Sequence, residues 1–113
     1  MVKLVKVLEH KFDTKRKLKS EKDSYKLLQE FVFEKYYKLY TPILRGFPDY
    51  IVIKVKKEYE EYLKAGFYEI KFNRGRLSPY QITFLSSLAA AFPVYLVIVK
   101  SDYSFQILQV VYE

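Results

Sequence analysis

Two acidic residues and one lysine have the clearest potential for chemistry in this sequence. Asp49 follows Pro48, and Glu69 stands two residues before Lys71 in the segment Glu69-Ile70-Lys71. Carboxylate oxygens are the ligands that Mg²⁺ and Mn²⁺ prefer, and an amine can orient water or stabilise negative charge. Two acids and an amine around one divalent cation are suited to the hydrolysis of a phosphodiester bond.

Each of these residues has a definite part in such a reaction. A cation held by Asp49 and Glu69 would neutralise the phosphate and lower the pKa of a bound water. The backbone carbonyl of Ile70 is a further candidate ligand. Lys71 would orient or deprotonate the attacking water, or stabilise the charge that develops on the phosphate.

The two acids lie in or beside predicted strands. The β-branched run in Asp49–Val55 predicts a buried strand, and Phe67–Phe72 predicts the next. Side chains two residues apart on a strand point to the same face, so Glu69 and Lys71 should share one. An exposed cross-strand ion pair and a turn aspartate are the simpler interpretations. The apolar flanks of Glu69 disfavour the ion pair, because unpaired charge is costly in a buried strand.

The sequence predicts a helix after the basic loop Asn73-Arg74-Gly75-Arg76, and this is the second helix along the chain. Ser78 is an N-cap, Pro79 takes the first helical position, and Gln81 completes a capping box. Gln81 can serve as a cap, as a site residue, or as both. The helix should end at Pro93 and bury a stripe of Ile82, Leu85, Leu88, Ala89 and Phe92.

Three segments together resemble the PD-(D/E)XK nuclease superfamily, and within it the VRR-NUC group. They are Gly46-Phe47-Pro48-Asp49, Tyr68-Glu69-Ile70-Lys71 and Leu77-Ser78-Pro79-Tyr80-Gln81. The superfamily, which includes archaeal Holliday junction resolvases, has a four-stranded mixed sheet flanked by helices, with its acids on the second and third core strands. The resemblance covers about residues 21–113. It implies metal ligands at Asp49 and Glu69, a catalytic Lys71 and a supporting Gln81.

The resemblance also implies an acid on the first helix. We predict this helix over Glu21–Tyr40, with Ser20 as its N-cap and Pro42 beyond its end. Its inward stripe would be Tyr25, Leu28, Val32 and Tyr36. The candidate acids are Glu21, Glu30 and Glu34. Glu21 is preferred because it continues the stripe, and Glu30 is the second choice.

The remaining pattern predicts an α/β fold with a restriction-endonuclease-like core, a central mixed β-sheet of four to five strands flanked by helices. Residues 1–12 fit neither a helix nor a strand cleanly, and residues 13–20 predict a loop. We expect a single nuclease domain over residues 1–113, with a basic N-terminal segment (1–20) and a catalytic core (21–113). Further predictions are strands over 43–45, 94–99 and 105–112, and a short helix or excursion over 56–64.

The amino-acid composition excludes several kinds of active site. The 113 residues include no Cys and one His, His10, which excludes thiolate sites, a multi-histidine zinc site and a Cys nucleophile. We expect His10 to be a surface or packing residue. The net charge is +7, and residues 1–26 carry nine basic against four acidic side chains, which favours a polyanionic partner.

The expected partner is DNA, and the expected cofactor is Mg²⁺ or Mn²⁺. Candidate phosphate contacts are Arg74 and Arg76 in the loop after Phe72 and Lys15, Arg16 and Lys17 near the N-terminus, although both groups are also compatible with exposed basic loops. Family resemblance favours a homodimer that cuts branched DNA or nicks it. A nucleic-acid-binding protein without catalysis is the alternative, and an assembly protein a third. Without a signal peptide or a spanning segment, we expect a soluble, cytoplasmic protein.

Overall fold

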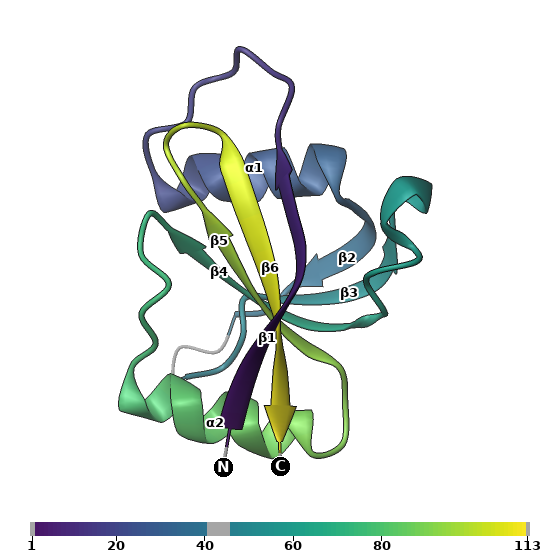
Figure 1. Cartoon of the computed structure of the whole chain (residues 1–113), viewed down its shortest axis with the longest axis vertical. Helices are drawn as coiled ribbons and strands as arrows, with labels where there is room; N and C mark the ends of the chain where they lie inside the picture. The colour runs from purple at the N-terminus through teal and green to yellow at the C-terminus, as the bar shows by residue number, and fades with distance from the viewer. Residues whose placement is uncertain (1, 41–45, 113) are drawn as a thin grey trace.

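A computed structural model describes residues 2–40 and 46–112 of the chain (Figure 1). Its elements form one twisted sheet with a helix against each face. In chain order they are β1 (Val2–Lys11), α1 (Glu21–Phe31), β2 (Phe33–Lys38), β3 (Tyr50–Val55), the 3₁₀ turn η1 (Lys57–Tyr59), β4 (Gly66–Phe72), α2 (Pro79–Ala89), β5 (Val94–Val99) and β6 (Ser104–Tyr112).

The six strands lie in the order β1-β6-β5-β4-β3-β2. β4 and β5 are parallel and every other neighbouring pair is antiparallel, so the sheet is mixed. This confirms an α/β fold, but the expected four to five strands were too few. The additional strands are β1, whose pattern was ambiguous, and β2, which lies inside the predicted first helix.

The helices pack against opposite faces of the sheet. α1 contributes Leu28 to a large cluster that includes Val97 of β5, whereas α2 contributes Leu85 to a smaller cluster with Val94 and Val110. Val94 and Val97 are three residues apart on β5, so they point to opposite faces. In Figure 1 the twisted sheet separates α1 at one end of the molecule from α2 at the other.

The predicted helix over Glu21–Tyr40 was wrong in its second half. α1 ends at Phe31, and the chain continues as β2, which pairs with β3. Phe33 is fully buried against Tyr50 and Tyr68. Pairing with β3 and burial of this ring outweigh a helical spacing that Tyr36 matched by coincidence.

The second helix has its predicted start but buries less than expected. α2 begins at Pro79 with the Ser78 capping box and ends at Ala89, four residues before Pro93. Leu85 is buried, and two members of the expected stripe are not: Ile82 is 46% exposed and Phe92 is 52% exposed. The two contact clusters place the large buried core on the α1 side and only a small one under α2.

The basic N-terminal segment is part of the sheet. β1 pairs with β6 from Val2 opposite Tyr112 to Lys11 opposite Ser104, so the start of β1 and the end of β6 lie side by side near α2 (Figure 1). Residues 13–20 contain no helix or strand, as predicted, and neither does Phe12 before them. Their buried side chains Phe12 and Leu18 attach this loop to the core. The predicted strand over 43–45 lies outside the described residues.

Within the described part of the chain, no helix is both long and apolar enough to cross a membrane.

Candidate active site

Asp49 lies immediately before β3, at the point where the pairing between β3 and β4 ends. The last paired residues are Tyr50 and Tyr68. Beyond this pair, the side chain of Asp49 provides the hydrogen-bond acceptor that a strand backbone would otherwise provide. Its Oδ2 accepts a hydrogen bond of 2.8 Å from the backbone N–H of Ile70. Burial raises the pKa of Asp49, and the Ile70 hydrogen bond opposes that shift.

Pro48 explains why the ladder ends there. Extending the antiparallel register by two residues places Pro48 opposite Ile70. Pro48 has no N–H to donate, so it cannot satisfy the Ile70 carbonyl as a strand residue would. The N–H and C=O of a strand residue project to the same edge, which directs the Ile70 carbonyl toward the side on which Asp49 lies.

Glu69 is the buried acid of the site. It lies in β4, is 3% exposed, and faces α2 together with Phe67, which belongs to the α2 cluster. Its Oε2 accepts a hydrogen bond of 2.5 Å from Nε2 of Gln81 and lies 3.4 Å from Nζ of Lys71. Its Oε1 is buried and has no hydrogen-bond partner among the described residues. An unsatisfied buried carboxylate oxygen is costly unless something else binds it.

The carboxyl groups of Asp49 and Glu69 meet. Burial, followed by the negative charge of Asp49, raises the pKa of Glu69 to about 8. The nearby negative charge of Asp49 favours the protonated form of Glu69. Lys71 is the nearest opposing charge and pulls the pKa of Glu69 down. The two acids therefore share one location and do not point to opposite sides of the sheet.

Gln81 completes the predicted capping box and also contacts Glu69. Its Oε1 accepts a hydrogen bond of 3.0 Å from the backbone N–H of Ser78, which completes the capping box. Its Nε2 donates to Glu69. One side chain thus joins the start of α2 to the buried acid, and the cap determines where the amide can reach.

Of the three acids predicted on the first helix, only Glu21 reaches the site, and it does so through another residue. The hydroxyl of Tyr25 lies 2.7 Å from Oε1 of Glu21 and 3.1 Å from Oδ1 of Asp49. Burial raises the pKa of Tyr25, so this hydroxyl stays protonated and donates. Glu30 pairs instead with Arg16, and Glu34, which lies in β2, pairs with Lys54, both at the surface.

The described residues contain no group of three Asp, Glu, His or Cys side chains placed to hold a metal. A divalent cation would therefore rely on Asp49, Glu69 and the Ile70 carbonyl. The orphaned Oε1 of Glu69 fits this use, because the donor set is oxygen only and one of its atoms lacks a partner. Such a site leaves coordination positions for water and substrate, as is usual for Mg²⁺.

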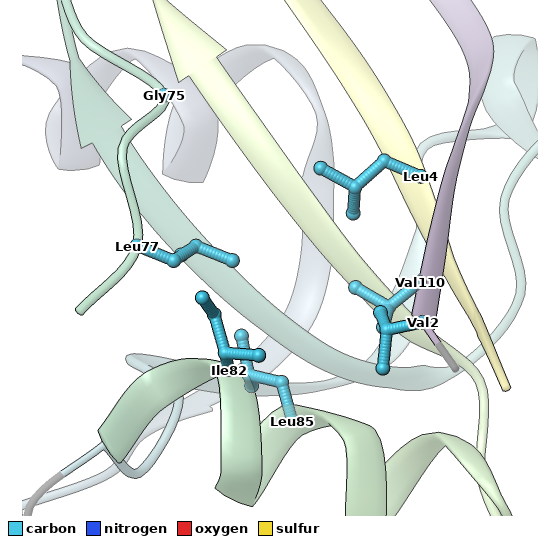
Figure 2. A pocket seen from close by; sticks show the side chains of 7 residues that line it. All are labelled: Val2, Leu4, Gly75, Leu77, Ile82, Leu85 and Val110. Atoms are coloured by element: carbon cyan, nitrogen blue, oxygen red, sulfur yellow. The ribbon is translucent and has the colours of Figure 1, made fainter. Parts of the chain in front are cut away.

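A cleft of about 480 Å³ opens beside the site. Lys71, Gln81 and Arg76 line it, which places one of the two predicted loop arginines next to the catalytic candidates. An apolar hollow of about 250 Å³ adjoins the cleft and shares Leu77 and Ile82 with it (Figure 2). Figure 2 shows these two side chains on the left of the hollow and the side chains of β1 and β6 on the right.

The other predicted phosphate contacts are exposed side chains, and each lies in a surface loop. Arg74 is in the same loop as Arg76, and Lys15 precedes α1. Arg16 and Lys17 line a hollow of about 370 Å³ together with Lys26 of α1. His10 lies outside the site, with edge contacts to the rings of Tyr59 and Phe105.

Gly46 fixes the approach to Asp49, and its replacement should disturb the site. Gly46 has φ +84°, and a Cβ there would lie 2.4 Å from the backbone oxygen of Tyr80. We expect Gly46→Ala to lower the free energy of unfolding by about 1–3 kcal/mol, measured by denaturant titration. Gly75→Ala should cost less, because its Cβ meets only the flexible end of the Ile98 side chain. An unchanged stability in Gly46→Ala would contradict this account.

Sequence reasoning missed the contacts of Tyr25 with the acids. Tyr25 was assigned to a packing stripe, although its spacing of four residues from Glu21 on a helix could have indicated contact. It also missed Lys38, whose Nζ lies 4.5 Å from the centre of the Tyr25 ring. No local signal identifies Lys38, because its position depends on β2 being a strand.

Comparison of the chain with protein-family models, with curated protein sequences and with solved structures gives no match.

Proposed function

We propose that this protein is a divalent-metal-dependent endonuclease of the PD-(D/E)XK type that hydrolyses phosphodiester bonds in DNA. One observation carries the proposal: the carboxyl groups of Asp49 and Glu69 meet beside Lys71, and Oε1 of Glu69 is buried with no hydrogen-bond partner in the part of the chain that the structure describes. A buried acid with an oxygen that has no hydrogen-bond partner lowers the stability of the fold, which a purely structural role does not require.

The arrangement of the elements supports a restriction-endonuclease-like core. The resemblance predicts a four-stranded mixed sheet with acids on its second and third strands. β2, β3, β4 and β5 form such a sheet, with one parallel pair and two antiparallel pairs. Asp49 precedes the second of these strands and Glu69 lies on the third. In this proposal β6 and β1 extend the core on the side of β5.

The residues of the site divide the chemistry between them. Asp49, Glu69 and the Ile70 carbonyl would hold Mg²⁺ or Mn²⁺, which supplies charge neutralisation and a water of lowered pKa when bound. Gln81 holds Glu69 in place by its amide hydrogen bond. Lys71, whose side chain is 21% exposed, lines the open cleft and can exchange a proton with a water or contact the scissile phosphate.

The positive charge of the chain supports DNA as the substrate, bound without sequence recognition. The chain carries a net charge of +7, and Arg76 lines the cleft next to Lys71. The lysines and the arginine of the loop before α1 would add contacts to the DNA phosphate backbone. Such contacts increase affinity but do not recognise individual bases. We propose structure-selective cutting of branched DNA or nicking. Two copies of the chain would present two sites to two strands.

A cleavage panel tests the proposal. Single-stranded, duplex, flap and four-way DNA substrates are incubated with the protein, each with Mg²⁺, with Mn²⁺ and with EDTA. We expect cleavage of at least one substrate only with metal, and loss of that cleavage in Asp49→Asn. Asp102→Asn is the matched control, because Asp102 is an exposed acid in the turn between β5 and β6 and does not line the cleft.

The outcomes separate the candidate functions. Activity that survives Asp49→Asn would overturn the assignment of the site. Salt-sensitive DNA binding without cleavage under either metal would indicate a nucleic-acid-binding protein with this fold. Absence of both metal binding and DNA binding would exclude both functions.

A further inference from the structure

The hydroxyl of Tyr25 lies between two carboxylates that belong to different elements. It is 2.7 Å from Oε1 of Glu21, one turn earlier on α1, and 3.1 Å from Oδ1 of Asp49, before β3. A phenol has one hydrogen to donate, so it can serve only one of the two carboxylates at a time. Glu21 therefore meets Asp49 through Tyr25, and no direct contact between the two acids is seen in the described structure.

The ring that carries this hydroxyl is held in place. The ring of Tyr25 makes a T-shaped contact with the ring of Tyr50, with 5.6 Å between the centroids and 82° between the planes. Nζ of Lys38 lies 4.5 Å from its centroid, in a cation–π contact. Tyr50 and Lys38 are cross-strand partners on β3 and β2, so the ring of α1 is attached to the sheet next to Asp49.

Both oxygens of Asp49 are consequently engaged by the protein. Oδ2 accepts from the N–H of Ile70, and Oδ1 lies 3.1 Å from the Tyr25 hydroxyl, whose single hydrogen Asp49 shares with Glu21. Contacts from two elements, one at each oxygen, fix the plane of the carboxylate and so the direction of its other lone pairs. Outer hydrogen bonds of this kind commonly determine how well a carboxylate holds a metal.

We propose that Tyr25 is a positioning residue that orients Asp49 for cation binding, and that Glu21 acts mainly through the Tyr25 hydroxyl. This inference rests on the proposed function, because it takes Asp49 as a metal ligand. It changes the expected role of Glu21, which supports the tyrosine and does not bind the cation itself. Lys38 and Tyr50 hold the ring that makes this possible.

The experiment measures Mn²⁺ binding by calorimetry in the absence of DNA, together with DNA cleavage over a range of Mn²⁺ concentrations. We expect Tyr25→Phe to raise the Mn²⁺ dissociation constant about 10-fold, within the range observed for loss of an outer-shell partner. The Mn²⁺ concentration for half-maximal cleavage should rise by a similar factor. Cleavage at saturating Mn²⁺ should return to within about 3-fold of the unmodified protein, because Tyr25 touches no reacting atom.

A double-mutant comparison tests the role of Glu21. Glu21→Gln should weaken Mn²⁺ binding less than Tyr25→Phe, and adding it to Tyr25→Phe should have little further effect. Tyr62→Phe is the control, because Tyr62 is a 50% exposed phenol outside the site. Circular dichroism checks that each variant is folded, and recovery of cleavage at high Mn²⁺ separates a positioning role from a loss of structure.

Three results would overturn the inference. Unchanged Mn²⁺ affinity in Tyr25→Phe would show that the hydroxyl does not position Asp49. A full additional loss from Glu21→Gln in the Tyr25→Phe background would show that Glu21 contacts the ion directly. Cleavage that stays low at all Mn²⁺ concentrations would place Tyr25 at the reacting atoms. In each of these the unmodified protein still binds Mn²⁺ and cleaves, whereas failure of both in the unmodified protein contradicts the proposed function itself.

Discussion

Lys71→Ala should reduce metal-dependent DNA cleavage by about 10²–10⁴-fold, the range associated with loss of a positioned acid or base. The side chain lies 3.4 Å from Glu69 and lines the cleft that the substrate would enter. Loss of its charge removes the group that can orient a water or stabilise a developing negative charge. This factor corresponds to about 3–5 kcal/mol of transition-state stabilisation.

Two measurements separate this role from a general loss of charge. Mn²⁺ should still bind to Lys71→Ala, because both carboxyl groups and the Ile70 carbonyl are retained, and saturating Mn²⁺ should not restore cleavage. Lys54→Ala is the matched control: it removes one lysine from an exposed ion pair with Glu34 and should cleave like the unmodified protein. Recovery of Lys71→Ala at high Mn²⁺, or equal losses in the two variants, would contradict a catalytic role.

Glu69→Gln should abolish cleavage and metal binding while making the metal-free protein more stable. The introduced side chain has nearly the same shape and can still accept a hydrogen bond from Gln81. It carries no charge in a position where burial and Asp49 oppose ionisation. We expect the free energy of unfolding at pH 8 to rise by about 1–3 kcal/mol, measured by denaturant titration with EDTA present.

The pH dependence of this effect has a definite sign. The pKa of Glu69 rises from 4.5 in the unfolded chain to about 8 in the folded protein. Between these values the folded state binds the proton more tightly than the unfolded state, so the contribution of Glu69 to stability falls as pH rises through this window. The Glu69→Gln variant has no acid at this position, so this part of its stability does not fall as pH rises. Its stability advantage should therefore be small at pH 4.5 and largest at about pH 8 and above.

Metal binding should reverse the order of stability of the unmodified protein and the Glu69→Gln variant. Mn²⁺ should raise the melting temperature of the unmodified protein, because it binds the folded state and neutralises the two acids. It should leave Glu69→Gln unchanged. Glu61→Gln, at an exposed position outside the site, should show neither the gain in EDTA nor the loss of the Mn²⁺ response. A Glu69→Gln protein that is less stable than the unmodified one at pH 8 would show that this acid stabilises the fold.

Sequence alone determined the parts of the fold that depend on local chemistry. The Ser78, Pro79 and Gln81 pattern specified the start of α2 because its cap is formed within four residues. The continuous apolar run of β5 specified a buried strand, and the alternation on β4 placed Glu69 and Lys71 on one face. These inferences were right because neighbouring residues decide them.

The tertiary structure alone decided what depends on pairing between distant segments. Residues 33–38 form β2 because β3 offers a partner and Phe33 a buried position, which no local spacing reveals. The same pairing brings Lys38 over Tyr25, and the end of the β3–β4 ladder at Pro48 brings Asp49 to the Ile70 N–H. Spacing along the chain singled out Asp49 and Glu69 as candidate acids. Only the packing of α1 against the sheet placed Tyr25 between Glu21 and Asp49, because contacts made across a fold are set by the surfaces that pack together and leave no period in the sequence.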